Sequence, residues 1–134
     1  MKYIADQNIA LDQLINLYTS VGWNSYTQNP RQLQKAIANS LLAIGAYDHN
    51  QLVGLIRVVG DGLTIIYIQD LLVNPAYQRR GIGTKLMNSV LKKYNSVRQK
   101  VLLTENSFKT RMFYESCNFK PCDKYDLIAF YKDF

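Results

Sequence analysis

At 134 residues the chain is long enough for one domain with a real core and too short for two, so we expect a single domain over residues 1–134. Apolar residues make up 48% and charged residues 19%, a balance that excludes a disordered chain. The net charge of +6 and the isoelectric point near 9.3 favour acidic partners. Because the basic residues are scattered along the chain rather than gathered in one block, we do not expect nucleic acid to be that partner.

No run approaches the roughly 18 apolar residues of a membrane span, and the first residues lack the apolar stretch of a signal peptide. We therefore expect a cytoplasmic protein that does not use a membrane. Cys117 and Cys122 are five positions apart, and His49 is the only histidine. This spacing indicates neither a disulfide framework nor a metal site, and it predicts two reduced thiols.

The N-terminal third predicts a short strand and two helices. Residues 2–4 favour a strand. From residue 9 to residue 21 apolar side chains recur at helical spacing, and Gly22 follows as a stop. Asn29 with Pro30 behind it is typical of a helix start, with Asn29 as the cap.

A hairpin and a central strand are predicted next. Residues 41–47 and 52–59 are β-rich runs joined by a turn, which leaves His49 exposed at a loop tip. Another turn leads into residues 63–73, which are nearly unbroken in apolar character and therefore belong in the sheet centre, buried on both faces. Asp70 interrupts this run, and a buried carboxylate must be paired, hydrated or functional.

The second half predicts a helix at residues 82–94, a strand at 97–104, a helix at 108–116 and a last strand at 125–131. With the earlier elements this order predicts a mixed α/β domain around a central sheet. An exposed apolar final strand can pair with a second subunit, which leaves a homodimer open.

Residues 78–84, Gln-Arg-Arg-Gly-Ile-Gly-Thr, lie between the central strand and the helix at 82–94. Glycine at 81 and 83 lets the backbone turn with its N–H groups outward, and the following helix adds free donors and the positive end of its dipole. Arg79 and Arg80 add two permanent charges, which suit a diphosphate. The stretch thus predicts a phosphate cradle, the alternative being a glycine-rich turn without a ligand.

Two known phosphate-binding designs do not fit this stretch. A Walker loop needs four residues between its glycines and then Lys-Ser/Thr, and a dinucleotide fingerprint needs a third glycine or alanine where Leu86 stands. The remaining pattern, Gln-x-x-Gly-x-Gly between a strand and a helix, resembles the GNAT superfamily of acyl-CoA-dependent N-acetyltransferases. Residues 113–119, Phe-Tyr-Glu-Ser-Cys-Asn-Phe, are similar to a second motif of that family, with Asn118 where glycine is usual. Asn also tolerates a positive φ.

The resemblance implies a mixed, mostly antiparallel sheet that splays into a V-shaped slot and is flanked by about four helices. Acetyl-CoA would lie in the slot as co-substrate, its pantetheine along the central strand and its diphosphate on the cradle, and no metal is implied. The coenzyme contacts implied are Leu71, Leu72, Val73, Gln78, Arg79, Arg80, Gly81, Ile82, Gly83 and Thr84, together with Asn106 or Ser107.

Transfer of an acetyl group to an amine needs a base for the amine and an acid for the departing thiolate. Tyr114 matches the family tyrosine beside the coenzyme sulfur and is the candidate acid, the alternative being a core aromatic. Asp70 is the candidate base, the alternative being a structural carboxylate bonded to backbone or arginine, and Tyr77 is a weaker alternative proton carrier. Strand alternation places Tyr67 and Gln69 opposite Asp70 unless a bulge intervenes.

The acceptor side is set by the variable loops. Residues 20–23, 60–62 and 70–83 resemble plant-type serotonin acetyltransferases and small bacterial members of the family, which implies a primary amine such as an arylalkylamine or a polyamine. Aminoglycosides, amino acids and protein N-termini stay open, as does an acyl-CoA-binding sensor without turnover. The candidate acceptor contacts are Trp23, Tyr26, Tyr67 and Gln69.

Overall fold

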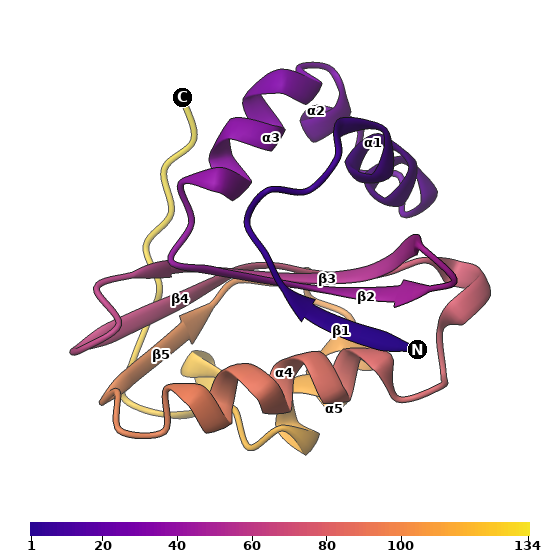
Figure 1. Ribbon diagram of the computed structural model, residues 1–134. Coiled ribbons are helices and arrows are strands. Elements are labelled where there is room, and N and C mark those ends of the chain that lie inside the picture. The colour runs from indigo at the N-terminus through magenta and orange to yellow at the C-terminus, as the bar shows by residue number, and fades with distance from the viewer. The chain divides into compact units, whose positions relative to one another are not determined.

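The computed structural model describes residues 1–134 as two compact units, residues 1–103 and residues 104–134. The first unit holds a five-stranded sheet in the order β1-β2-β3-β4-β5 (Figure 1). Its strands are β1 Lys2–Ala5, β2 Leu42–Asp48, β3 Gln51–Gly60, β4 Ile65–Val73 and β5 Gln99–Leu102. The first three pairs of neighbours are antiparallel and β4 with β5 is parallel, so the predicted mixed, mostly antiparallel sheet is confirmed.

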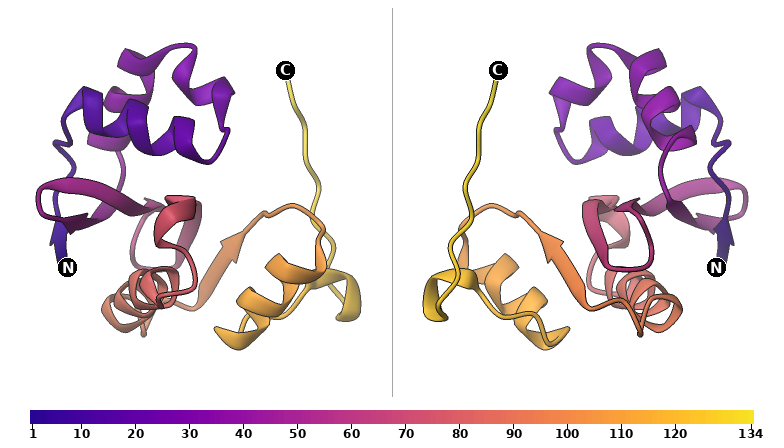
Figure 2. Two further views of the ribbon diagram at one scale, coloured as in Figure 1. Left: turned by 90° about the vertical axis from the view of Figure 1, so that its right-hand side faces the viewer. Right: turned by 90° about the vertical axis from the view of Figure 1, so that its left-hand side faces the viewer.

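Helices cover both faces of this sheet. In Figure 1 α1, α2 and α3 lie on one face of the sheet and α4 lies on the other, and Figure 2 shows the same layers from two further sides. The helices of this unit are α1 Leu11–Ser20, α2 Asn24–Thr27, α3 Pro30–Ala38 and α4 Ile82–Lys93. The predicted boundary signals hold: the Asn29 side chain accepts a hydrogen bond from the N–H of Gln32, and Gly22 has φ +77°. The one-turn helix α2 lies between the two helices that the N-terminal third of the sequence predicts.

The main core lies between the sheet and the three helices α1–α3. It is built from aliphatic side chains of both layers plus one tyrosine, Tyr18. The hairpin prediction is confirmed by the pairing of β2 with β3, and His49 and Asn50 at its turn have φ values of +48° and +74°. No helix combines the length and the hydropathy that spanning a bilayer takes.

A β-bulge at Gln69 sets which way the side chains of β4 point. Arg57 pairs with Asp70 and Val58 pairs with Ile68, so Gln69 is the extra residue and the alternation of β4 reverses there. Asp70 therefore shares a face with Tyr67. That face is the one covered by α1–α3, because Leu72, two positions on, lies in the core cluster.

The parallel pairing of β4 with β5 is short. It runs from Ile65 with Gln99 to Ile68 with Leu102 and then ends, so the strand predicted over residues 97–104 is only four residues long. Beyond Ile68, β4 has no strand beside it on its β5 side. This open edge is where the predicted splay of the sheet begins.

The second unit contains α5 Phe108–Ser116, as predicted, and a 3₁₀ turn, Cys122–Lys124. Asn118 has φ +67°, which explains its place after the helix. Both cysteines are free thiols, as predicted, with Cys117 buried and Cys122 exposed.

The predicted last strand at residues 125–131 is wrong. These residues form no helix or strand, and no strand of the sheet pairs with them. Their mostly apolar side chains are exposed instead, among them Leu127, Ile128 and Phe130. The apolar composition that suggested a strand is real, but a strand also needs a neighbour.

Candidate active site

The loop before α4 has the backbone shape of an anion cradle. Arg79 and Gly81 both take the left-handed conformation, with φ +64° and +81°, and a Cβ added at Gly81 would meet nothing within 4 Å. The first helical hydrogen bond of α4 runs from Lys85 N–H to the carbonyl of Gly81. None of the N–H groups of residues 79–84 donates to a protein acceptor. Consecutive free N–H groups at a helix start are donors available to an anion.

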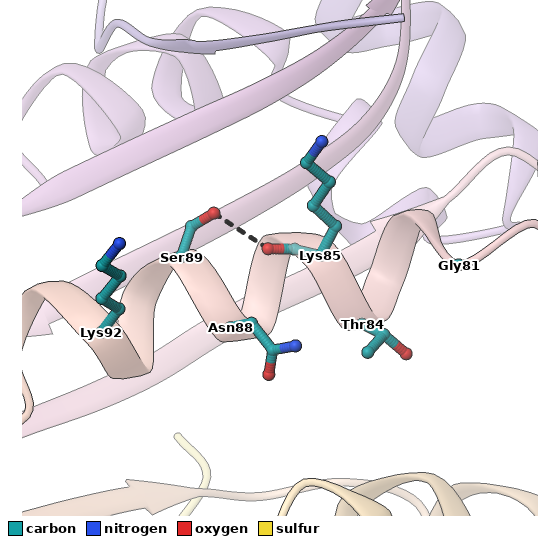
Figure 3. A pocket seen from close by; sticks show the side chains of 6 residues that line it. All are labelled: Gly81, Thr84, Lys85, Asn88, Ser89 and Lys92. Atoms are coloured by element: carbon teal, nitrogen blue, oxygen red, sulfur yellow. Dashed lines mark hydrogen bonds between the residues drawn. The ribbon is translucent and has the colours of Figure 1, made fainter.

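Basic side chains lie in this loop and along the helix that follows it. The side chains of Arg79 and Arg80 are exposed, and the Arg80 guanidinium lies 5.1 Å from the ring centre of Tyr77. Further along α4, Lys85 and Lys92 extend from one side of the helix (Figure 3). They line a shallow pocket of about 430 Å³ together with Gly81, Thr84, Asn88 and Ser89. The cradle therefore continues into a polar, positively charged groove.

The open edge of β4 leads directly into the cradle. Leu71, Leu72 and Val73 follow the bulge and lie beyond the end of the β5 ladder. Gln78 links the loop back to the end of β4, because its side-chain amide donates a hydrogen bond to the carbonyl of Val73 at 3.0 Å. All the coenzyme contacts predicted between residues 71 and 84 thus lie on one continuous strand–loop–helix unit.

Asp70 is buried, and both of its carboxylate oxygens accept hydrogen bonds. Its side chain is 2% exposed, and Oδ2 accepts hydrogen bonds from Arg57 Nε at 2.8 Å and from the Tyr18 hydroxyl at 2.9 Å. Oδ1 accepts one from the Tyr26 hydroxyl at 2.8 Å. Arg57 compensates the charge of the carboxylate and also donates to Ser40 Oγ. These bonds meet the needs of a structural carboxylate, and one of them leads outward through Tyr26.

Tyr26 connects Asp70 to the surface. Its oxygen accepts a hydrogen bond from the exposed side chain of Gln69 at 3.1 Å while its own proton goes to Asp70. Trp23 packs beside it, with ring centres 6.2 Å apart. Three of the four predicted acceptor contacts, Trp23, Tyr26 and Gln69, are therefore brought together, and Tyr67 lies on the same face of the sheet.

Burial and the Asp70 carboxylate keep the two hydroxyls of this cluster protonated. The pKa of Tyr26 is raised, mainly by desolvation and then by the charge of Asp70. The same two causes raise the pKa of Tyr18 well above its ordinary value. Both phenols are therefore hydrogen-bond donors to Asp70 at neutral pH.

In the second unit, Tyr114 lies on α5 between Phe113 and Phe119, with ring centres 5.0 and 6.1 Å away. Burial raises the pKa of Tyr114 to about 12, so the phenol holds its proton at neutral pH. Ser107 caps α5 by accepting from the N–H of Thr110, and the Asn106 side chain accepts from Arg111.

Sequence reasoning missed Arg57 and Tyr18 as partners of Asp70. A signal for Arg57 existed: Arg57 and Asp70 are the only charged residues of their two apolar strands, and they lie at similar distances from the turn between those strands. Tyr18 carried no signal, because a tyrosine on the buried face of a helix looks like any other core aromatic.

The fold and the site together define an α/β protein with a loop of free N–H groups beside an open sheet edge. Residues 12–126 match the family model described as acetyltransferase (GNAT) domain. The chain therefore belongs to the GNAT acetyltransferase family.

Individual relatives agree with this assignment. Over 91 residues the chain is 36% identical to an uncharacterized N-acetyltransferase, ycf52-like, of Prochlorococcus marinus, a match that covers 64% of this chain and 49% of the relative. The chain thus spans about half the length of the curated relative it matches.

Solved structures match over nearly the whole chain. A GNAT family acetyltransferase of Streptococcus pneumoniae TIGR4 is 34% identical with a TM-score of 0.88, covering 99% of this chain and 97% of that one. An aminoglycoside N-acetyltransferase solved in complex with CoA has a TM-score of 0.76 at 12% identity, covering 98% and 93%, which is a likeness of fold alone.

Proposed function

We propose that this protein transfers an acetyl group from acetyl-CoA to a primary amine. The observation that carries the proposal is the run of free N–H groups at residues 79–84, placed directly after the open edge of β4. An extended pantetheine can hydrogen-bond to an open strand edge, and a diphosphate can accept from the free N–H groups. Family membership and the CoA complex of a protein with the same fold support this ligand.

Acetyl-CoA, when bound, supplies a thioester that an amine can attack without a protein nucleophile. A backbone N–H near Leu72, on the open edge, is proposed to donate to the thioester carbonyl oxygen and to stabilise the negative charge that develops there. Leu71 and Val73 would align the pantetheine beside it. The free thiols Cys117 and Cys122 have no role in this scheme.

Asp70 is proposed as the base, acting through Tyr26. As the amine gives its proton to the Tyr26 oxygen, the Tyr26 hydroxyl proton moves to Oδ1 of Asp70, to which it is already hydrogen-bonded. The Asp70→Asn variant tests this role through the pH profile of kcat/KM. Loss of the acidic limb supports a base at Asp70, and an unchanged limb would leave Asp70 only its structural bonds to Arg57 and the tyrosines.

Tyr114 is proposed as the acid. Its phenol is protonated at neutral pH because burial raises its pKa to about 12. Since a thiol has a pKa of about 8.5, the phenol stabilises a departing thiolate first by donating a hydrogen bond to it. In this proposal Asn106 or Ser107 contacts the coenzyme from the same unit.

For the acceptor we propose a small cationic amine with an apolar or aromatic body. Trp23 and Tyr26 offer ring surface, and Gln69 offers a polar group beside it. An arylalkylamine and a polyamine both fit this description. Aminoglycosides are a further class to test, because several proteins of the same fold are aminoglycoside acetyltransferases.

A panel of amines tests the activity and the acceptor together. Purified protein is mixed with acetyl-CoA and one amine at a time: an arylalkylamine, a polyamine, an aminoglycoside, an amino acid and a peptide N-terminus. Release of free CoA thiol is measured against a reaction without amine. The proposal predicts amine-dependent release with one class preferred. Binding of acetyl-CoA without release for any amine would favour the alternative, an acyl-CoA-binding sensor.

We also propose that the protein forms a homodimer through residues 125–131. The apolar side chains of this segment are exposed, Phe130 by 90%, and an apolar segment without a strand neighbour can pair with a second copy of the chain. Light scattering at several concentrations tests this proposal. Replacing Ile128 by proline, which removes a strand N–H, should lower the dimer fraction, and a monomer at all concentrations would contradict the proposal.

A further inference from the structure

A phosphate cradle binds well only if its free donors are held in the binding geometry before the ligand arrives. The cradle here contains a non-glycine residue in the left-handed conformation, Arg79, which costs roughly 1 kcal/mol or more and persists only where neighbours enforce it. The loop therefore needs contacts that hold its backbone.

Two anchors hold the two ends of the loop. Before it, Asn74 N–H donates to the carbonyl of Val53 at 2.8 Å, and the Asn74 side chain accepts from the N–H of Ala76. After it, Ile82 is buried against Gly54, where an added Cβ would come within 3.0 Å of the isoleucine side chain. Neither contact reaches the arginines in the middle of the loop.

A third contact reaches the middle of the loop from the far hairpin. The Tyr77 hydroxyl donates to Oδ2 of Asp48 at 2.7 Å, and Asp48 is the last residue of β2. The other carboxylate oxygen of Asp48 contacts His49 Nδ1 at 2.9 Å. The ring of Tyr77 in turn supports the Arg80 guanidinium, 5.1 Å from its centre, in a cation–π contact.

We infer that Asp48 and Tyr77 are positioning residues for the diphosphate site: they fix the loop and the Arg80 side chain without touching the ligand. The inference rests on the proposed function, because it takes acetyl-CoA as the ligand. Mutual hydrogen bonding supports it, since the bond lowers the pKa of Asp48 and raises that of Tyr77, which keeps the donor and the acceptor in their paired forms at neutral pH. Tyr77 thereby gains a role other than carrying a proton.

The experiment compares two ligands in the unaltered protein and in three variants. Calorimetry gives Kd for acetyl-CoA and for acetyl-pantetheine, which has the same acyl arm and no diphosphate. Tyr77→Phe keeps the ring under Arg80 and removes the hydrogen bond, and Asp48→Ala removes its acceptor. Each should weaken acetyl-CoA about five- to tenfold, the effect of one hydrogen bond, and leave acetyl-pantetheine unchanged. The double variant should be no weaker than either single variant, because both remove the same bond.

Two controls separate positioning from general damage. Asp48→Asn keeps an oxygen acceptor and should bind acetyl-CoA as the unaltered protein does. Asp12→Ala removes an exposed carboxylate on α1 with the same change of net charge and should have no effect. Equal losses for both ligands, additive single effects, or a folded Tyr77→Phe variant with unchanged affinity would overturn the inference. If the unaltered protein failed to bind acetyl-CoA at all, the proposed function itself would fall.

Discussion

Two regions of the first unit differ in whether their polar groups have hydrogen-bond partners within the protein. Around Asp70 every side-chain donor and acceptor is matched, from Arg57 and Ser40 to the two tyrosines. In the cradle the N–H groups of residues 79–84 have no protein acceptor at all. Matched groups in a buried site fix geometry, whereas unmatched donors at an exposed helix start are free for a ligand. The difference separates a buried cluster whose bonds fix its geometry from a loop whose donors are free for the proposed ligand.

The largest effect on stability should come from the matched region. Arg57→Ala leaves a buried carboxylate without its cation, and breaking a buried ion pair costs about 3–5 kcal/mol. Denaturant unfolding measures this loss. The matched control is Arg79→Ala in the cradle, which should change the free energy of unfolding by no more than about 0.5 kcal/mol while weakening acetyl-CoA. Equal unfolding midpoints for the two variants would contradict the claim that the Asp70 cluster, and not the cradle, stabilises the fold.

In the second unit, the half-buried Tyr114 carries a hydroxyl that we propose acts in catalysis. Tyr114→Phe should lower kcat about tenfold or more and leave the KM for acetyl-CoA nearly unchanged, in line with the removal of a general acid. Tyr125→Phe, which removes an exposed hydroxyl from the same unit, serves as control and should have no effect on kcat. If chemistry limits turnover and Tyr114→Phe keeps full activity, Tyr114 is a core aromatic.

Two glycines allow an effect on acetyl-CoA binding at the cradle to be separated from an effect on stability. Gly81 and Gly22 have nearly the same φ, +81° and +77°, and both have open space where a Cβ would be. Replacing either by alanine should cost about 1 kcal/mol of stability, because the left-handed conformation disfavours a side chain. Only Gly81→Ala should also raise the Kd for acetyl-CoA, since only there does the new methyl group enter the path of the anion. Similar affinities for the two variants would argue against a ligand at Gly81.

A smaller effect should come from Asp61, which is exposed yet fully matched. Its carboxylate accepts from the Thr64 hydroxyl and from the N–H groups of Leu63, Thr64 and Ile65, and these bonds lower its pKa. The stability that Asp61 adds is therefore present above its unfolded pKa of about 3.9 and is lost as the pH falls through the lower folded value. The stability gap between the unaltered protein and Asp61→Ala should shrink below about pH 4. A gap that is independent of pH would contradict this account.

Much of the fold follows from local signals in the sequence. Asn29 with Pro30, the glycines at 22 and 81, and the turn at residues 48–51 each mark an element boundary that the structure keeps. The prediction failed at residues 125–131, which are rich in apolar residues but pair with no strand of the sheet. A strand forms only when it pairs with another strand, and a single sequence does not show which segment that is.

The candidate site also has parts that depend on neighbouring residues and parts that depend on residues far apart in the sequence. The cradle is local, and Gly81 marks one of its two left-handed positions, but the other is Arg79, which no glycine marks, and Gly83 lies within α4. The surroundings of Asp70 are not local, because Tyr18, Tyr26 and Arg57 come from three separate elements. The bulge at Gln69 decides which face Asp70 points to, and nothing in the residue pattern of β4 marks a bulge. The hydrogen bond from Tyr77 to Asp48 likewise joins residues 29 positions apart.

The central claim is that the free N–H groups of residues 79–84 hold the diphosphate of acetyl-CoA. Isothermal titration of the purified protein with acetyl-CoA, at low and at high salt, tests it most directly. The account predicts saturable binding to one site that weakens as salt rises, because the ligand is anionic and the cradle is exposed and basic. An absence of heat with acetyl-CoA at millimolar concentration would contradict it.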